Sequence, residues 1–226
     1  MLTRLKLLAA IVFAIACVAT AQSNRFAGVV HPSLAPFEFS VHVDDQKDGP
    51  TEGFHAIDRI EVRSAGRPAQ TIQFAGEDTP TFRGPWKEAV SLQDVDCDGY
   101  KDLLVQMSVG IHGDAWYHLY RFNQARGQFV EYPRFSSLPL KKIDCGSKLI
   151  TTYVNSGAAG CAYEKGKYRW VDGELLPMRI ESQEIADDGG FMRTVSSWSN
   201  GKETIHKRRI NGDDCHRANQ KTANSR

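Results

Sequence analysis

The feature that most restricts the fold of this chain is a strict alternation of apolar and polar residues. The alternation is complete in residues 37–43 (FEFSVHV), and residues 57–62 and 115–122 repeat it. Successive side chains of a β-strand point to opposite faces, so a period of two is typical of strands with one buried face. No segment has the convincing period of an amphipathic helix. The alternation therefore predicts an all-β protein.

Further strands are expected in regular succession, separated by turns that contain glycine. The dipeptides Asp172-Gly173 and Asn200-Gly201 are typical of tight hairpin turns. The other expected strands are residues 71–74, 128–131, 148–154, 161–171, 174–180, 192–198 and 203–208. Short strands at such spacing predict a single antiparallel domain, either a β-sandwich or a barrel-like, propeller-like arrangement.

The first 21 residues have the layout of a secretory signal peptide. Two basic residues precede an apolar stretch at 7–18, and Ala19-Thr20-Ala21 matches a small-x-small cleavage site. The apolar stretch is shorter than the roughly 20 residues that span a bilayer, so no transmembrane span is expected. Because Cys17 follows a weak version of the lipobox, a lipid anchor at Cys17 is the alternative to plain cleavage after Ala21. Either way we expect a periplasmic protein.

These features divide the chain into four parts. They are the signal peptide (1–21), an exposed leader (22–34), one β domain (35–210) and a polar tail (211–226). The formal net charge of the whole chain is only +1 and includes the basic residues of the signal peptide. The exported part therefore lacks a basic net charge that would attract nucleic acid, and no such partner is expected.

Four cysteines remain after the signal peptide: Cys97, Cys145, Cys161 and Cys215. An even number in an oxidising compartment predicts two disulfides, for which three connectivities are possible. We favour Cys145 bonded to Cys161, because that bond would close a short loop across a predicted hairpin, and Cys97 bonded to Cys215. Four buried free thiols are the alternative.

One acidic loop carries the strongest signal for a bound ligand. Residues 94–102 (DVDCDGYKD) place carboxylates at loop positions 1, 3, 5 and 9 and Gly99 at position 6. This spacing suits calcium, because alternate residues of a curled loop point inward and a carbonyl at position 7 completes the oxygen shell. Position 12 is Val105 where an EF-hand has Glu, so the loop must join two strands. We expect one structural calcium ion held by Asp94, Asp96, Asp98, Asp102 and the carbonyl of Tyr100. An acidic turn that binds nothing is the alternative.

Catalysis is not expected. Asp114, His112 and His118 are close in sequence, but neither a nucleophile elbow nor a His-Glu-x-x-His helix accompanies them. Histidines in such a setting more often lie on the surface or in the core. The chain is therefore interpreted as a binding protein and not as an enzyme.

Several segments of the sequence resemble those of a known protein family. The run at 98–103 (DGYKDL), the aromatic hairpin at 116–122 (WYHLYRF) and the segments 127–130 (GQFV), 136–138 (SSL) and 156–160 (SGAAG) carry the resemblance. They resemble calcium-binding periplasmic immunity proteins of bacterial antagonism systems, which are similar in architecture to invertebrate-type lysozyme inhibitors. The resemblance covers residues 37–180, and its calcium loop is also shared with integrin-like repeats.

The resemblance implies a function for the chain. It implies inhibition of a peptidoglycan hydrolase, such as a lysozyme-like toxin, by insertion of a loop into the active-site cleft. The positions that match the inhibitory loop are Ser156, Gly157 and Tyr163, although five residues separate Gly157 from Tyr163 where the short inhibitors have fewer. A calcium-binding envelope adhesion or carbohydrate-binding module is the alternative function.

Overall fold

The computed structural model describes residues 24–45, 54–212 and Cys215. The expected signal peptide at 1–21, including Cys17, lies outside the described residues, and so does most of the polar tail. Within the described residues strands are the dominant element, the helices are short, and all strand pairs are antiparallel. The predicted fold class is confirmed.

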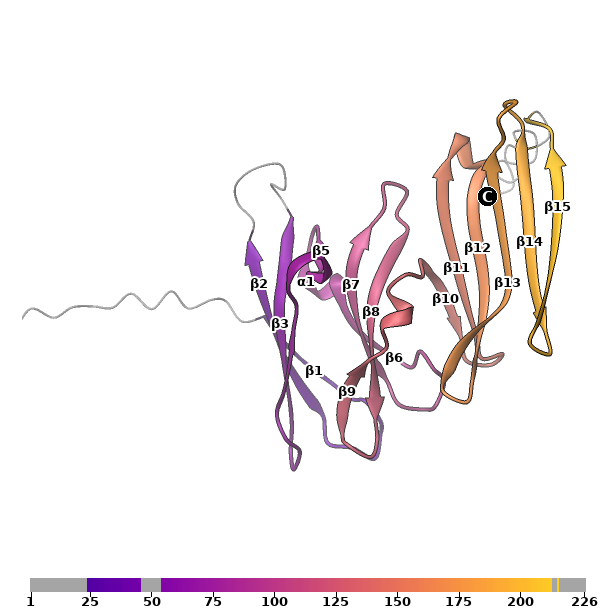
Figure 1. The fold of residues 1–226 in the computed structure, drawn as a ribbon. Coiled ribbons are helices and arrows are strands. Elements are labelled where there is room, and N and C mark those ends of the chain that lie inside the picture. The colour runs from indigo at the N-terminus through magenta and orange to yellow at the C-terminus, as the bar shows by residue number, and fades with distance from the viewer. Residues whose placement is uncertain (1–23, 46–53, 213–214, 216–226) are drawn as a thin grey trace, which may run out of the picture.

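The strands form three sheets, each made of strands that are consecutive in the sequence (Figure 1). Sheet A contains β1 (Asn24–Gly28), β2 (Phe37–Asp45), β3 (His55–Ser64), β4 (Gln70–Gln73) and β5 (Thr81–Phe82). Sheet B contains β6 (Val90–Gln93), β7 (Asp102–Val109), β8 (Ala115–Asn123) and β9 (Gln128–Glu131). Sheet C contains β10 (Leu140–Asp144), β11 (Leu149–Gly157), β12 (Ala162–Val171), β13 (Glu174–Ile185), β14 (Phe191–Ser199) and β15 (Lys202–Ile210). The short helical elements are α1 (Trp86–Ala89), η1 (Gly76–Asp78), η2 (Pro133–Phe135) and η3 (Ala158–Gly160).

Sheet B lies between the other two and is covered on both faces (Figure 1). Leu103 and Val105 of β7 pack in the apolar cluster shared with sheet A, whereas Leu104 packs in the cluster shared with sheet C. Likewise in β8, Tyr120 packs in the cluster shared with sheet A and Leu119 in the cluster shared with sheet C. Because successive residues of a strand face opposite sides, the unbroken apolar run of β7 needs an apolar layer on each side.

Two apolar clusters join the layers. The cluster between sheets A and B is rich in phenylalanine, with Phe37 packed edge-on against Phe122 at 5.5 Å between ring centroids. The cluster between sheets B and C includes Ile150, Tyr168 and Trp170. The indole N–H of Trp170 donates to the carbonyl of Val95 at 2.8 Å, so the second cluster also fixes the loop that follows β6. The core of the molecule therefore consists of two interfaces on either side of one central sheet.

Every strand expected from the alternation is present, but the arrangement differs from the expectation in two ways. Each sheet of the described chain is open, so the layers stack as in a sandwich of three sheets, and the barrel-like alternative is wrong. The exposed leader at 22–34 is also wrong in part, because β1 pairs with β2 at the edge of sheet A. Phe26 of β1 stacks on Phe39 at 4.6 Å, and Val30 is buried.

The two expected disulfides form, but with a different pairing. Cys97 is bonded to Cys145, and Cys161 is bonded to Cys215. The favoured pairing of Cys145 with Cys161 is wrong because the two residues flank opposite ends of β11. A strand of nine residues is roughly 30 Å long, far beyond the reach of a disulfide. Two disulfides are typical of proteins in an oxidising, exported environment.

The helices of the described chain are all short. None of them has the length and apolar character that a membrane crossing requires.

We expect Leu104→Ala to lower the free energy of unfolding by about 2–5 kcal/mol, because it opens a cavity in the interface between sheets B and C. Leu176→Ala is the control, since Leu176 is an exposed residue of β13. It should change stability by about 0.5 kcal/mol or less. Urea unfolding measures both variants, and equal losses would contradict the double burial of sheet B.

We expect removal of the Cys97–Cys145 bond by the double change Cys97→Ala and Cys145→Ala to cost about 2–4 kcal/mol. The bond closes a loop with a sequence separation of 48, and opening it enlarges the unfolded ensemble. Denaturant unfolding of the double variant measures the cost. Peptide mapping under non-reducing conditions checks the pairing itself, and a Cys145–Cys161 peptide would refute it.

Candidate functional site

The acidic loop connects β6 to β7 at one end of sheet B. Gln93 and Asp102 are opposite each other in the register of the two strands, so residues 94–101 form the turn between them. Gly99 has a φ of 93°, a backbone conformation that residues with a side chain rarely adopt. Cys97 also has a positive φ, of 59°. The loop is thus tightly curled, as its glycine position predicts.

Three carboxylates of this loop converge. One oxygen from each of Asp94, Asp96 and Asp102 lies within 4.8 Å of the other two. Calcium binds oxygen at about 2.4 Å, so two oxygens on one ion are at most about 4.8 Å apart. At an effective dielectric of 20, two carboxylates at this distance repel by roughly 3 kcal/mol. The three side chains therefore fit the demands of a divalent cation.

Asp102 is the most deeply placed of the three. Its side chain is 1% exposed and accepts hydrogen bonds from the backbone N–H groups of Val95 at 3.0 Å and Phe122 at 2.9 Å. Burial and the charge of Asp96 raise the pKa of the Asp102 carboxyl to about 7, although the two N–H donors partly oppose the rise. A nearby cation would favour the ionised form.

Asp96 has a second partner that the sequence did not indicate. The Arg121 guanidinium from β8 donates to its carboxylate, through Nε at 2.7 Å and through a shorter contact from a terminal nitrogen. Arg121 also donates to the carbonyl of Gly173 at 3.0 Å and lies 4.8 Å over the ring of Trp170. Burial raises the pKa of Asp96, but the hydrogen bond and the charge of Arg121 counteract this. When all three carboxyls are ionised, the single guanidinium leaves the loop with a net charge near −2.

The other two expected ligands are placed differently. Asp98 is exposed and its carboxylate is not part of the converging group; it accepts a hydrogen bond from the N–H of Tyr100 at 2.8 Å. The ring of Tyr100 stacks on His31 at 4.3 Å and on Phe122 at 5.7 Å. The structure therefore brings together three of the four predicted carboxylates, and Asp98 closes the turn.

The Cys97–Cys145 disulfide fastens the loop to sheet C. Cys145 lies in the turn between β10 and β11, and its Sγ is 3.4 Å from the carbonyl oxygen of Asp94. The loop is thus held from three sides, by the disulfide, by Arg121 and by the indole of Trp170. The loop is therefore braced before any ion binds.

The expected inhibitory segment forms the tip between β11 and β12. We call residues 156–160 the β11–β12 tip. Gly157, Ala158, Ala159 and Gly160 all have positive φ, at 106°, 49°, 52° and 82°. Ser156, Ala158 and Ala159 are exposed. Alanine in this region costs roughly 1–3 kcal/mol, so the tip is a strained, exposed backbone turn.

The neighbours of the tip hold its base in place. The Asp114 carboxylate accepts from the N–H of Asn155 at 3.1 Å, and the side chain of Asn155 accepts from the N–H of Gly157 at 2.9 Å. After the tip, Cys161 is bonded to Cys215. The tip is therefore anchored on both sides, although its disulfide partner is Cys215 and not Cys145.

A groove of about 460 Å³, which we call the tip groove, lies beside the β11–β12 tip. Ser156 and Tyr163 both line it, together with Trp116 from β8. Burial raises the pKa of Tyr163 to about 12, and its hydroxyl donates to Glu181 at 2.8 Å. Of the three expected inhibitory residues, Ser156 and Tyr163 thus share one groove, and Gly157 begins the strained turn.

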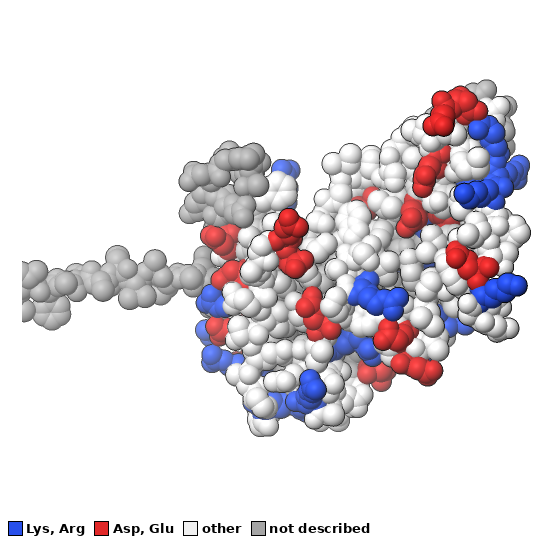
Figure 2. Space-filling model, in the orientation of Figure 1, with Lys and Arg blue, Asp and Glu red and all other residues white. Residues whose placement is uncertain are grey.

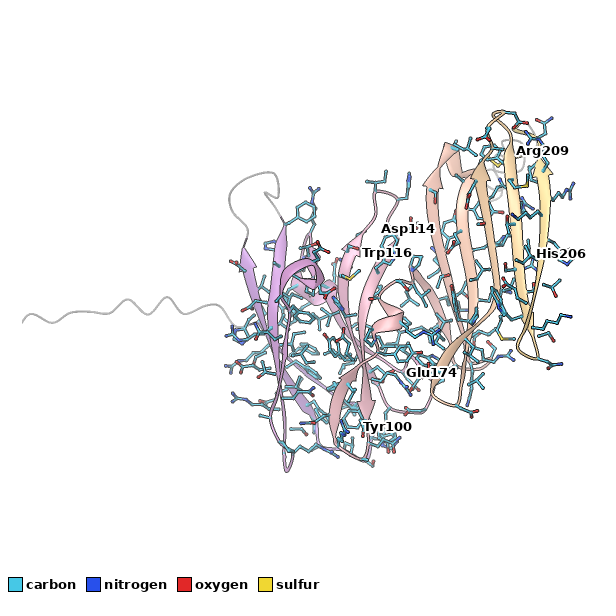
Figure 3. The ribbon with its side chains drawn as sticks, viewed as in Figure 1. Tyr100, Asp114, Trp116, Glu174, His206 and Arg209 are labelled. Carbon is cyan, nitrogen blue, oxygen red and sulfur yellow. A yellow bond between two sulfur atoms is a disulfide. The ribbon has the colours of Figure 1, made fainter. Side chains whose placement is uncertain are left out.

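The acidic loop and the β11–β12 tip lie at opposite ends of the molecule. Figure 3 shows Tyr100 at the lower end of sheet B, and Asp114 and Trp116 at its upper end near sheet C. The length of β11 alone separates the two ends by roughly 30 Å. An ion in the loop would therefore act on the tip only through the scaffold.

Sequence reasoning missed Arg121 and the true partner of Cys97. Arg121 lies 25 residues from Asp96, and no spacing pattern links them. The cysteine pairing follows from the stacking of sheets B and C, which the strand pattern does not contain. The sequence feature nearest to this contact was the aromatic hairpin at 116–122, which contains Arg121.

Comparison with known proteins gives one similar fold. No family model and no curated protein matches the chain. The solved structure of a Xanthomonas type IV secretion system related protein is similar with a TM-score of 0.55, over 83% of this chain and 95% of that chain. The sequences are 15% identical, so the comparison establishes a shared fold.

Proposed function

We propose that this chain is a periplasmic immunity protein that inhibits a peptidoglycan hydrolase through its β11–β12 tip. We further propose that one calcium ion, held by Asp94, Asp96 and Asp102, braces the scaffold at the opposite end. Asp98 and the carbonyl of Tyr100 would be the remaining oxygen donors of the expected set.

The observation that carries the inhibitory role is the exposed turn of four residues with positive φ. Strained backbone persists only where the surroundings hold it, and such positions cluster at binding and catalytic sites. Small side chains at Gly157, Ala158 and Ala159 leave the backbone itself as the contact surface. A segment of this kind can enter a sugar-binding cleft that larger side chains could not.

Anchoring supports the same role. The Cys161–Cys215 bond and the Asp114 carboxylate fix the two sides of the tip. A loop that is already ordered loses less conformational entropy when it binds. Inhibition by a fixed tip therefore needs few strong contacts.

The polar groups at the tip suit a glycosidase cleft. Glycosidases carry a pair of carboxyl groups in the cleft, and the exposed hydroxyl of Ser156 can donate to one of them. The hydroxyl of Tyr163 already donates to Glu181, so this bond fixes the ring in place and occupies the hydroxyl. This assignment departs from the expectation that both hydroxyls contact the enzyme.

Calcium in the acidic loop has a structural part in this proposal. The ion would neutralise the net charge near −2 and hold the ends of β6 and β7 against sheet C. The ion would link the carboxylates of the loop to one another. It would not contact the hydrolase, since the loop is roughly 30 Å from the tip. The similar fold belongs to a protein described as type IV secretion system related, which agrees with a setting of bacterial antagonism.

We expect chelator-treated protein to bind about one equivalent of calcium in calorimetry, with a rise in Tm, because binding to the folded state alone stabilises it. Asp94→Asn should weaken binding by about tenfold or more, since it removes a charge but keeps an acceptor oxygen. Asp187→Asn, an exposed aspartate of another turn, is the matched control and should bind as the wild type does.

An absence of heat, together with equal Tm values in calcium and in chelator, would contradict the calcium proposal. Equal weakening by Asp94→Asn and Asp187→Asn would assign the effect to net charge and not to the loop.

We expect Ser156→Trp to reduce inhibition of the target hydrolase by about tenfold or more, because a bulky side chain at the tip blocks entry into the cleft. The measurement is peptidoglycan hydrolysis by each member of a panel of lysozyme-like and amidase enzymes, with and without the protein. Ser199→Trp is the control, since Ser199 is an exposed residue at the end of β14 that precedes the opposite turn of sheet C. Both variants should keep the wild-type Tm.

Full inhibition by Ser156→Trp would place the inhibitory surface elsewhere. A wild-type protein that inhibits none of these enzymes but binds purified peptidoglycan would favour the carbohydrate-binding alternative.

A further inference from the structure

The outer face of sheet C carries a second surface, whose charged residues have no part in the proposed function. Tyr168 and Trp170 of β12 point inward to sheet B, so Tyr163 and Lys165, an odd number of residues away, point outward. The strand register then defines which residues share that outer face. The first cross-strand row is Asn155, Tyr163, Gln183, Arg193 and Arg208. The next row is Tyr153, Lys165, Glu181, Val195 and His206.

A cleft of about 440 Å³, which we call the outer cleft, lies over these two rows. Tyr153, Lys165, Arg193 and Arg208 are among its lining residues. The size is that of a small-molecule site. Its lining is rich in hydrogen-bond donors.

One buried carboxylate, Glu181, pairs with two of the cations that line the outer cleft. Glu181 is 7% exposed and lies 3.1 Å from the Lys165 ammonium, 3.3 Å from Arg179 and 3.8 Å from Arg193. Burial opposes its ionisation, but hydrogen bonds from Tyr163 and Lys165 outweigh burial and lower the pKa of Glu181. Three cations thus share a single negative charge.

Arg208 adds a fourth cation directly opposite Arg193 on the neighbouring strand. Like charges at facing positions of a sheet repel each other. Within the described residues, no ion pair includes Arg208, whereas its neighbour Arg209 pairs with Asp188. The four cations and one carboxylate leave an excess charge near +3 on the outer face. The near-neutral net charge of the chain conceals this local excess.

Charges of opposite sign are mixed on the face of the molecule that Figure 2 shows. Figure 2 shows acidic and basic side chains interspersed over the face in view, without a large area of one sign. On the outer face of sheet C, by contrast, the register gathers cations from β12, β13, β14 and β15. The outer face of sheet C differs in this respect from the face in view.

We propose that the outer cleft binds a phosphate group between Arg193 and Arg208. Guanidinium groups match the geometry of oxyanions and donate two parallel hydrogen bonds to them. A phosphate group can accept hydrogen bonds from both guanidinium groups at once, and its negative charge offsets part of the excess. Lys165 and the phenol of Tyr153 supply further donors at the same cleft. This inference goes beyond the proposed function and does not rest on it.

The test uses inorganic phosphate titrated into isotope-labelled protein at low ionic strength, followed by NMR. We expect saturable shift changes of residues in β14 and β15. Arg208→Gln should weaken binding by about tenfold, because it removes charge-assisted hydrogen bonds. Lys207→Gln is the matched control, since it removes the same charge from the adjacent residue of β15, which faces the other side of the sheet.

A second arm identifies the source of the phosphate group. Sedimentation with phosphatidylglycerol vesicles, lost in Arg208→Gln but retained in Lys207→Gln, assigns it to a lipid headgroup. Binding of inorganic phosphate without binding of vesicles assigns it to a soluble molecule. Equal loss in the two variants, or no response to either probe, would overturn the proposal. Hydrolase inhibition by Arg208→Gln should match the wild type, so this test and that of the β11–β12 tip fail independently.

Discussion

The architecture depends on the burial of sheet B on both faces. A strand such as β7, apolar at consecutive positions, cannot leave either face in water, and two further sheets are needed to cover it. That requirement places β10 to β13 against β8, and with them the turn that carries Cys145. The same stacking brings Cys145 and Trp170 to the acidic loop, which Arg121 of sheet B also contacts.

Much of the fold could be predicted from the sequence because hairpins are local. Residues 37–43 and 115–122 specify their strands through alternation alone, and Asp172-Gly173 specifies a turn. The stacking order could not be predicted in this way. Alternation indicates that one face of a strand is buried, but not which sheet covers that face. β1 was missed for a related reason: it is short, and its place depends on the edge that β2 offers.

In the candidate site, too, the local features could be predicted from the sequence and the long-range contacts could not. The convergence of Asp94, Asp96 and Asp102 follows from loop spacing, which is a local property. The partner of Cys97 and the role of Arg121 depend on contacts between residues far apart in the chain. Asp98 illustrates the limit within the loop itself, because its carboxylate accepts the N–H of Tyr100 and is not among the three that converge. The loop spacing therefore predicts the curled turn, but not which of its carboxylates converge.

The last strand, β15, has a consequence for the behaviour of the protein in a crowded compartment. It is an edge of sheet C in the described chain, and an edge presents unpaired backbone groups that can recruit a strand from another molecule. Lys202, Lys207, Arg208 and Arg209 line this edge. Two such edges approaching each other would bring many positive charges together, so the strand repels its own copy. The positive charges of β15, which include Arg208 of the proposed anion site, therefore also disfavour aggregation through this edge.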